Sequence, residues 1–237
     1  MSTIQHSNSV LKTPLTNLKR AATLWPSETA FKVPIVHSTP GHERGQKITG
    51  YSNVTYTQLF NDIEATAQYW YDRLTSEGLN GGCKEVIGVC LEGNRYTDVV
   101  HIYALMRAGY VPQTFSLFPD ALEALNHLLN ASGARALVYQ RGVYDRVAGL
   151  KSMNPTLKII PTPATIAQVQ DYGSMPHIPN TDSEDPTSTQ IIFHTSGSTS
   201  GLPKAVRYSA RLIDVLITKA AVACAPQGNN QDVASWV

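Results

Sequence analysis

The 237-residue sequence lacks the patterns that mark several classes of protein. Its net charge is +1, so there is no excess of basic residues of the kind that contacts with nucleic acid or an anionic membrane require. No stretch reaches the roughly 18 consecutive apolar residues of a membrane-spanning helix. We therefore expect a cytoplasmic chain that binds neither nucleic acid nor a membrane.

Metal-ligand spacing is missing as well. The three cysteines, Cys83, Cys90 and Cys224, form no Cys-x-x-Cys pair, and the seven histidines form no His-x-x-x-His pair. We expect no metal site and reduced thiols, with Cys90 buried in an apolar strand. No Gly-x-Ser-x-Gly element is present either, so no nucleophilic serine is predicted and the catalytic residues stay unknown.

An apolar content of 42% is enough for a real core. Residues 1–27 contain Lys12, Lys19 and Arg20 but no acidic residue. We interpret them as a short tail followed by a first helix that begins at Thr13-Pro14; a weak organellar transit peptide is the alternative. Residues 28–237 are then expected to form one domain.

Hydrophobic periodicity alternates between helices and strands over that domain. Residues 57–75 carry one apolar stripe, with Thr57 placed to cap the helix and Gly78 to follow its end. Further helices are expected at 95–107, from Pro119 onward and at 210–224; strands are expected at 85–91, 110–115, 135–140 and 157–160. This order predicts an α/β fold with a mostly parallel sheet and flanking helices. A connector rich in proline, serine and aspartate, residues 173–189, leads to the next feature.

The most informative segment is the loop 194–204, which reads His-Thr-Ser-Gly-Ser-Thr-Ser-Gly-Leu-Pro-Lys and joins two β-like runs. Hydroxyls, glycine N–H groups and a lysine are the donors that suit a polyphosphate. The predicted phosphate-binding residues are Thr195, Ser196, Gly197, Ser198, Thr199, Gly201 and Lys204. The loop is not a Walker A motif, because Leu202-Pro203 separates Gly201 from the lysine. A solvated hairpin without a ligand is the alternative.

His194 precedes the loop and has two interpretations. It either lines a pocket for an acyl group or is a strand-end histidine hydrogen-bonded to the backbone. The sequence alone does not separate the two.

Residues 195–204 resemble the signature Thr/Ser-Ser-Gly-Ser/Thr-Thr-Gly-x-Pro-Lys of the adenylate-forming superfamily, with Ser200 as one extra residue. Both a subfamily variant and an inactivating lesion are consistent with that insertion. Residues 54–59 and 104–112 are similar to two earlier elements of the family, in the family's order. Within it, the chain looks most like the adenylation domains of fungal peptide-synthetase-like proteins of secondary metabolism.

The resemblance implies activation of a small carboxylic acid by ATP, giving an acyl-AMP and pyrophosphate. It also implies Mg²⁺ with the ATP, and CoA or the phosphopantetheine of a carrier domain as acyl acceptor in a full-length protein. The family's adenine, ribose and catalytic-lysine motifs come later than Lys204 and have no match here. We expect the front part of an adenylating ligase, as a fragment, a mis-predicted gene or a relic. The alternatives are a catalytically inactive remnant that binds nucleotide or a partner, and an unrelated phosphate-loop module.

Overall fold

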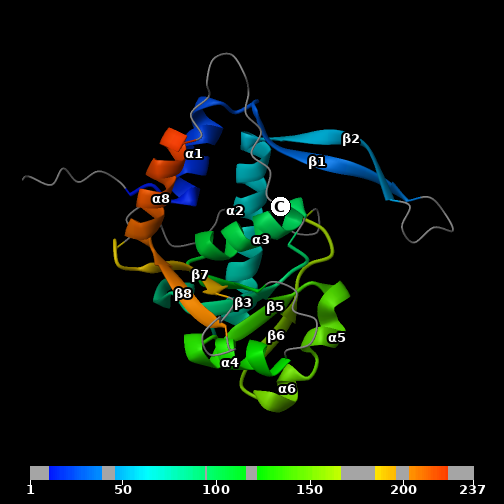
Figure 1. The fold of residues 1–237 in the computed structure, drawn as a ribbon, viewed down its shortest axis with the longest axis vertical. Coiled ribbons are helices and arrows are strands. Elements are labelled where there is room, and N and C mark those ends of the chain that lie inside the picture. The colour runs from blue at the N-terminus through cyan, green and yellow to red at the C-terminus, as the bar shows by residue number, and fades with distance from the viewer. Residues whose placement is uncertain are drawn as a thin grey trace, which may run out of the picture.

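A computed structural model shows an α/β molecule built on a six-stranded sheet, with a separate two-stranded hairpin projecting from it (Figure 1). The structure describes residues 11–38, 46–93, 95–115, 122–166, 185–195 and 203–223. The sheet has the strand order β6-β5-β3-β4-β7-β8. Its strands are β3 (Val86–Cys90), β4 (Val111–Phe115), β5 (Ala136–Tyr139), β6 (Lys158–Pro161), β7 (Thr189–Thr195) and β8 (Lys204–Ser209). All neighbours run parallel except β7 and β8, which are antiparallel.

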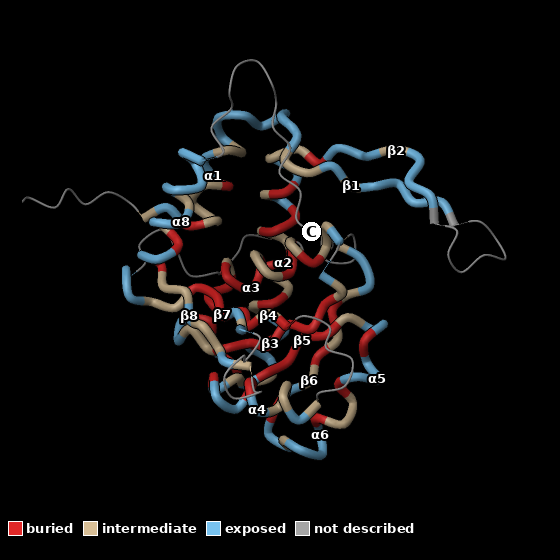
Figure 2. Tube along the Cα trace, in the orientation of Figure 1, coloured by how far each residue is buried: buried red, intermediate tan, exposed pale blue. Residues whose placement is uncertain are grey.

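Two helices, α2 (Tyr56–Ser76) and α3 (Tyr96–Arg107), cover one face of the sheet. Their apolar stripes pack on alternate residues of the central strands, such as Ile87 and Val138. Polar contacts join the two helices: the Tyr96 hydroxyl donates to Asp62 at 2.7 Å, and Arg107 pairs with Glu64 at 2.7 Å. Figure 2 shows buried residues along α2, α3 and the central strands.

The other face is covered by α4 (Leu122–Ser132) and by two short helices, α5 (Tyr144–Val147) and α6 (Leu150–Met153). Leu128 and Leu129 of α4 pack against Leu137 and Phe115 of the sheet. Close contact with this layer requires a glycine in β3, because a Cβ at Gly88 would lie 2.6 Å from Leu129 and 2.7 Å from Leu137. Short 3₁₀ turns are formed at Gly81–Cys83 and Arg141–Val143.

The remaining elements lie at the two ends of the chain. Helix α1 (Pro14–Leu24) lies beside α8 (Ala210–Ala223), and Lys12 joins them through hydrogen bonds to Asp214 at 2.9 Å and Thr218 at 3.2 Å (Figure 1). The hairpin of β1 (Thr29–Ser38) and β2 (Gln46–Thr55) projects away from the sheet. The sequence analysis did not predict this hairpin or the short helices α5 and α6.

The expected fold class is confirmed, and most elements lie within two residues of their expected positions. Thr13 caps α1 as expected, with its side chain accepting from the Thr16 N–H at 3.2 Å. Gly109 ends α3 in a left-handed conformation, φ 88°, which glycine adopts without steric cost. The cap of α2 was assigned wrongly: Thr55, not Thr57, accepts from the Gln58 N–H at 3.2 Å. Pro119 and residues 173–184 of the connector lie outside the described residues.

Candidate functional site

The carboxyl ends of the parallel strands meet at one edge of the sheet. The ends of β3, β4 and β5 are aligned there, with Cys90 paired to both Phe115 and Tyr139. β7 runs parallel to β4 and ends at the same edge. β8 starts at that edge because it runs antiparallel to β7. In open α/β sheets this edge is where ligands bind, next to the point at which successive connections change direction. Here the chain passes from β3 to β4 on one side and from β4 to β5 on the other.

Two of the predicted phosphate-binding residues are described, and they face each other. Thr195 is the last residue of β7 and Lys204 the first of β8, and the two are register partners in the antiparallel pair. Both are exposed. The other five, Ser196, Gly197, Ser198, Thr199 and Gly201, lie between them in the sequence and outside the described residues. The two strands that the sequence predicts on either side of the loop are therefore confirmed.

An open groove of about 450 Å³ lies beside Lys204, between α4 and β8. Its lining combines apolar surface with basic side chains: His127, Leu128, Ala131, Pro203, Lys204, Ala205 and Arg207. Arg207 also donates to the backbone oxygen of Ser132 at 3.0 Å, which fixes the end of α4 on β8. Lys204 thus borders a space that a ligand can enter.

His194 lies on the side of the sheet that faces α4. Its ring stacks on Phe115 with centroids 4.6 Å apart, and its Nε2 lies 3.4 Å from Nε2 of Gln113. Burial lowers the pKa of His194, because the charged imidazolium loses hydration there. Among the described residues its hydrogen-bond neighbour is therefore a side chain, not the backbone group that one interpretation of the sequence expected.

Gln113 is the residue that sequence reasoning missed at this site. It is fully buried in the middle of β4, where apolar residues are the rule. Its amide donates to the Leu128 oxygen at 3.2 Å and accepts from the Ser132 hydroxyl at 2.6 Å. An amide inside an otherwise apolar predicted strand was the available signal.

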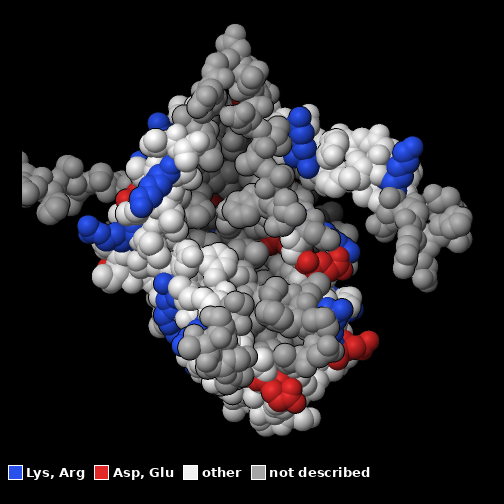
Figure 3. Space-filling view, viewed as in Figure 1, with Lys and Arg blue, Asp and Glu red and all other residues white. Residues whose placement is uncertain are grey.

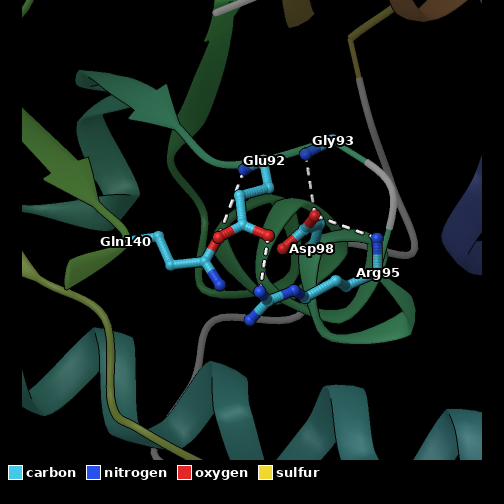
Figure 4. A network of polar contacts seen from close by, with 5 residues as sticks. All are labelled: Glu92, Gly93, Arg95, Asp98 and Gln140. Carbon is cyan, nitrogen blue, oxygen red and sulfur yellow. Dashed lines mark hydrogen bonds and ion pairs between the residues drawn. The ribbon is translucent and has the colours of Figure 1, made fainter. Parts of the chain in front are cut away.

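The turn between β3 and α3 forms another part of the rim (Figure 4). The Asp98 carboxylate accepts from the N–H groups of Gly93 at 2.8 Å and Arg95 at 3.1 Å, which caps the start of α3. Glu92 pairs with Arg95, and its N–H donates to the Gln140 side chain at 3.2 Å. These contacts satisfy the acidic groups locally and join the ends of β3 and β5.

Cys90 lies buried next to this turn, as predicted. Burial raises the pKa of its thiol to about 11, so the thiol is protonated at neutral pH. The described residues contain no group of three or more His, Cys, Asp or Glu side chains arranged to hold a metal ion.

Two further features of the described residues are the distribution of basic side chains over the surface and the apolar length of the helices. On the face seen in Figure 3, basic side chains lie at separate points, over the hairpin, beside α1 and α8 and near β8. None of the helices that the structure describes has the length and apolar character to cross a membrane.

Comparisons with known proteins agree with this architecture. A family model described as AMP-binding enzyme matches residues 18–236. An AMP-binding domain-containing enzyme, iboA of Amanita muscaria (strain Koide BX008), is 23% identical over 183 residues, which are 77% of this chain and 34% of that protein. The chain thus spans about a third of that relative.

Solved structures share the fold. The o-succinylbenzoate CoA synthetase of Bacillus subtilis, in complex with its acyl-adenylate intermediate, superposes with a TM-score of 0.61 at 16% identity, over 92% of this chain and 47% of that one. McyG A-PCP complexed with phenylalanyl-adenylate gives a TM-score of 0.62 at 16% identity, over 90% of this chain and 31% of that one. The region matched is the N-terminal part of adenylate-forming enzymes.

Proposed function

This chain belongs to the AMP-binding enzyme family, and we propose that it supplies the ATP phosphate-binding part of an enzyme that activates a carboxylic acid as its acyl-adenylate. In that reaction a carboxylate oxygen attacks the α-phosphorus of ATP. The new bond is an acyl–phosphate bond, and the bond to the β-phosphate breaks, so that pyrophosphate leaves. The loop between β7 and β8 would hold the β- and γ-phosphates.

The pairing of Thr195 with Lys204 carries the proposal. It brings a hydroxyl and an ammonium group to the carboxyl edge of the sheet, where open α/β sheets bind ligands, on either side of a sequence rich in N–H and hydroxyl donors. Donors that are already in place when charge moves onto a leaving pyrophosphate stabilise that charge without reorganisation. Ser196, Gly197, Ser198, Thr199 and Gly201 would complete the set.

The substrate and the acyl acceptor are inferred from the family only. The compared structures hold an o-succinylbenzoyl adenylate and a phenylalanyl-adenylate, so a small carboxylic acid is the substrate class we propose. CoA, or the phosphopantetheine of a carrier domain, would accept the acyl group. We assign no ligands to the Mg²⁺ expected with ATP, because the described residues hold no suitable cluster of acidic side chains.

The test is ATP binding by the Lys204→Ala variant, measured by calorimetry. Loss of one charge-assisted contact to a phosphate is expected to weaken ATP binding by roughly 10-fold or more. Lys151→Ala is the matched control, since Lys151 is an exposed lysine on α6 and should leave ATP binding unchanged. Equal ATP affinity in wild type and Lys204→Ala would rule out the assignment.

Turnover is a separate question, and isotope exchange between pyrophosphate and ATP answers it. Exchange that depends on an added carboxylic acid supports acyl-adenylate formation. ATP binding without exchange instead favours a nucleotide-binding module that does not catalyse the reaction.

A further inference from the structure

The arrangement of Gln113 on the α4 side of the sheet fixes which of its side-chain atoms faces His194. The Leu128 backbone oxygen can only accept a hydrogen bond, so the group 3.2 Å from it must be the Gln113 amide nitrogen. The amide oxygen then accepts from the Ser132 hydroxyl at 2.6 Å. Because Gln113 is fully buried between these partners, the amide is held in one orientation.

The same nitrogen has a second N–H, and His194 Nε2 lies 3.4 Å from it. A protonated Nε2 would set two donors against each other, so Nε2 must be the acceptor. In a neutral imidazole the proton is then on Nδ1. Stacking on Phe115 restricts rotation of the ring as well.

Nδ1 is then the donor of the ring. Among the described residues no hydrogen-bond partner for Nδ1 is found. His194 directly precedes Thr195, and Leu128, which accepts from Gln113, also lines the groove beside Lys204. The donor therefore belongs to the strand end at which Thr195 and Lys204 meet.

We propose that Gln113 is a positioning residue that keeps the proton of His194 on Nδ1, so that this N–H donates to an anionic oxygen bound beside Thr195 and Lys204. The inference rests on the proposed function, since the oxygen belongs to a phosphate of ATP or to the carboxylate of the acid. A neutral donor stabilises either anion without adding a charge that would have to be desolvated.

The first test measures the tautomer of His194 in the protein without ligand, from the two-bond ¹H–¹⁵N correlations of the histidine rings. The His194 signals are identified by their loss in His194→Asn. We expect an Nδ1-protonated ring in wild type and a shift toward the Nε2-protonated form in Gln113→Leu. A wild-type proton on Nε2 overturns the proposal, whatever the stability of the Gln113 variant.

The second test leaves Gln113 intact and uses pyrophosphate as the probe. An asparagine amide can take the place of Nδ1, whereas the longer glutamine amide reaches the place of Nε2. We expect His194→Asn to keep pyrophosphate affinity within about 3-fold of wild type, and His194→Gln to lose roughly 10-fold. Equal losses in both variants overturn the donor role, and no loss in either excludes a phosphate oxygen as the acceptor.

The source of the oxygen is read from the His194 Nδ1 signal during addition of pyrophosphate or of acetate. A response to pyrophosphate indicates a phosphate oxygen, a response to acetate indicates a carboxylate, and no response to either overturns the inference. These outcomes are separable from the proposed function. If binding of pyrophosphate depends on Lys204 and the Nδ1 signal responds to neither probe, the inference fails and the phosphate loop stands. An Nδ1 signal that responds only to acetate, with ATP binding independent of Lys204, removes the phosphate loop instead.

Discussion

The middle of the sheet and its β8 side differ in what surrounds them. Every residue of β3 and β5 is buried, because helices cover both faces of these strands. β8 has no buried residue, and α8 leaves Leu212, Val215 and Leu216 about two-fifths exposed. Polar and basic groups can remain hydrated on that side, whereas in the middle each one needs a partner. The residues that suit a phosphate are accordingly on the hydrated side.

His194 and Gln113 lie at the boundary between these two regions. Gln113 is the fully buried end of the contact, and His194 is half-buried next to the exposed Thr195. A buried amide can hold an imidazole in one state more firmly than an exposed one can, since water does not compete for its hydrogen bonds. In the proposed arrangement, a side chain in the interior orients a group that acts at the surface.

The largest expected difference between the two regions is in the free energy of unfolding lost when a leucine is truncated in each. Leu137→Ala in β5 should lower the free energy of unfolding by about 3 kcal/mol, because it removes a fully buried side chain and leaves a cavity. Leu216→Ala in α8, where the leucine is 44% exposed, should cost less than about 1 kcal/mol. Urea unfolding followed by circular dichroism measures both. Similar losses in the two variants would mean that α8 is covered by other surface in solution.

The pH dependence of stability should also distinguish the two regions, because each of them contains a histidine. Nδ1 of the buried His101 accepts from the Trp70 indole N–H at 3.2 Å, and burial lowers the pKa of His101 to about 4. The unfolded chain binds this proton near pH 6.5, so stability is complete above that value and is lost as the pH falls toward 4. Between pH 7 and pH 5 we expect a loss of roughly 2 kcal/mol.

The control is a pair of variants that act on one histidine each. His101→Gln keeps an acceptor for Trp70 but does not titrate, so most of the pH dependence should disappear from its urea unfolding curves. His194→Asn should retain most of it, because half-buried His194 loses less hydration on folding. An unchanged pH dependence in His101→Gln would contradict the account.

Much of the fold could be predicted from the sequence because burial imposes a pattern. β3 is an unbroken apolar run because both of its faces are covered, and α2 has a single stripe because one face is covered. The β1–β2 hairpin lacks such a pattern. It projects from the body with Ile35, Val36, Ile48 and Tyr51 exposed, and Pro34 lies within β1.

The site was predictable only in part. Residue types and their order indicated the phosphate loop, and the structure describes Thr195 and Lys204 at its ends. The contact between Gln113 and His194 joins strands that are 81 residues apart, and no local pattern encodes it. The contact forms because β4 and β7 are neighbours in the sheet.

The smallest expected effect on stability concerns the residue that caps the start of α2, the helix that covers the buried face. Both Thr55 and Thr57 are suitable caps by residue type, but only Thr55 has the extended backbone, φ −78° and ψ 163°, that lets its hydroxyl accept from the Gln58 N–H. Thr55→Ala should therefore cost about 1 kcal/mol in urea unfolding. Thr57→Ala, at an exposed position inside the first turn, should change stability by less than about 0.5 kcal/mol. A larger loss of stability in Thr57→Ala than in Thr55→Ala would show that Thr57 is the cap, as the sequence suggested, and that α2 starts two residues later.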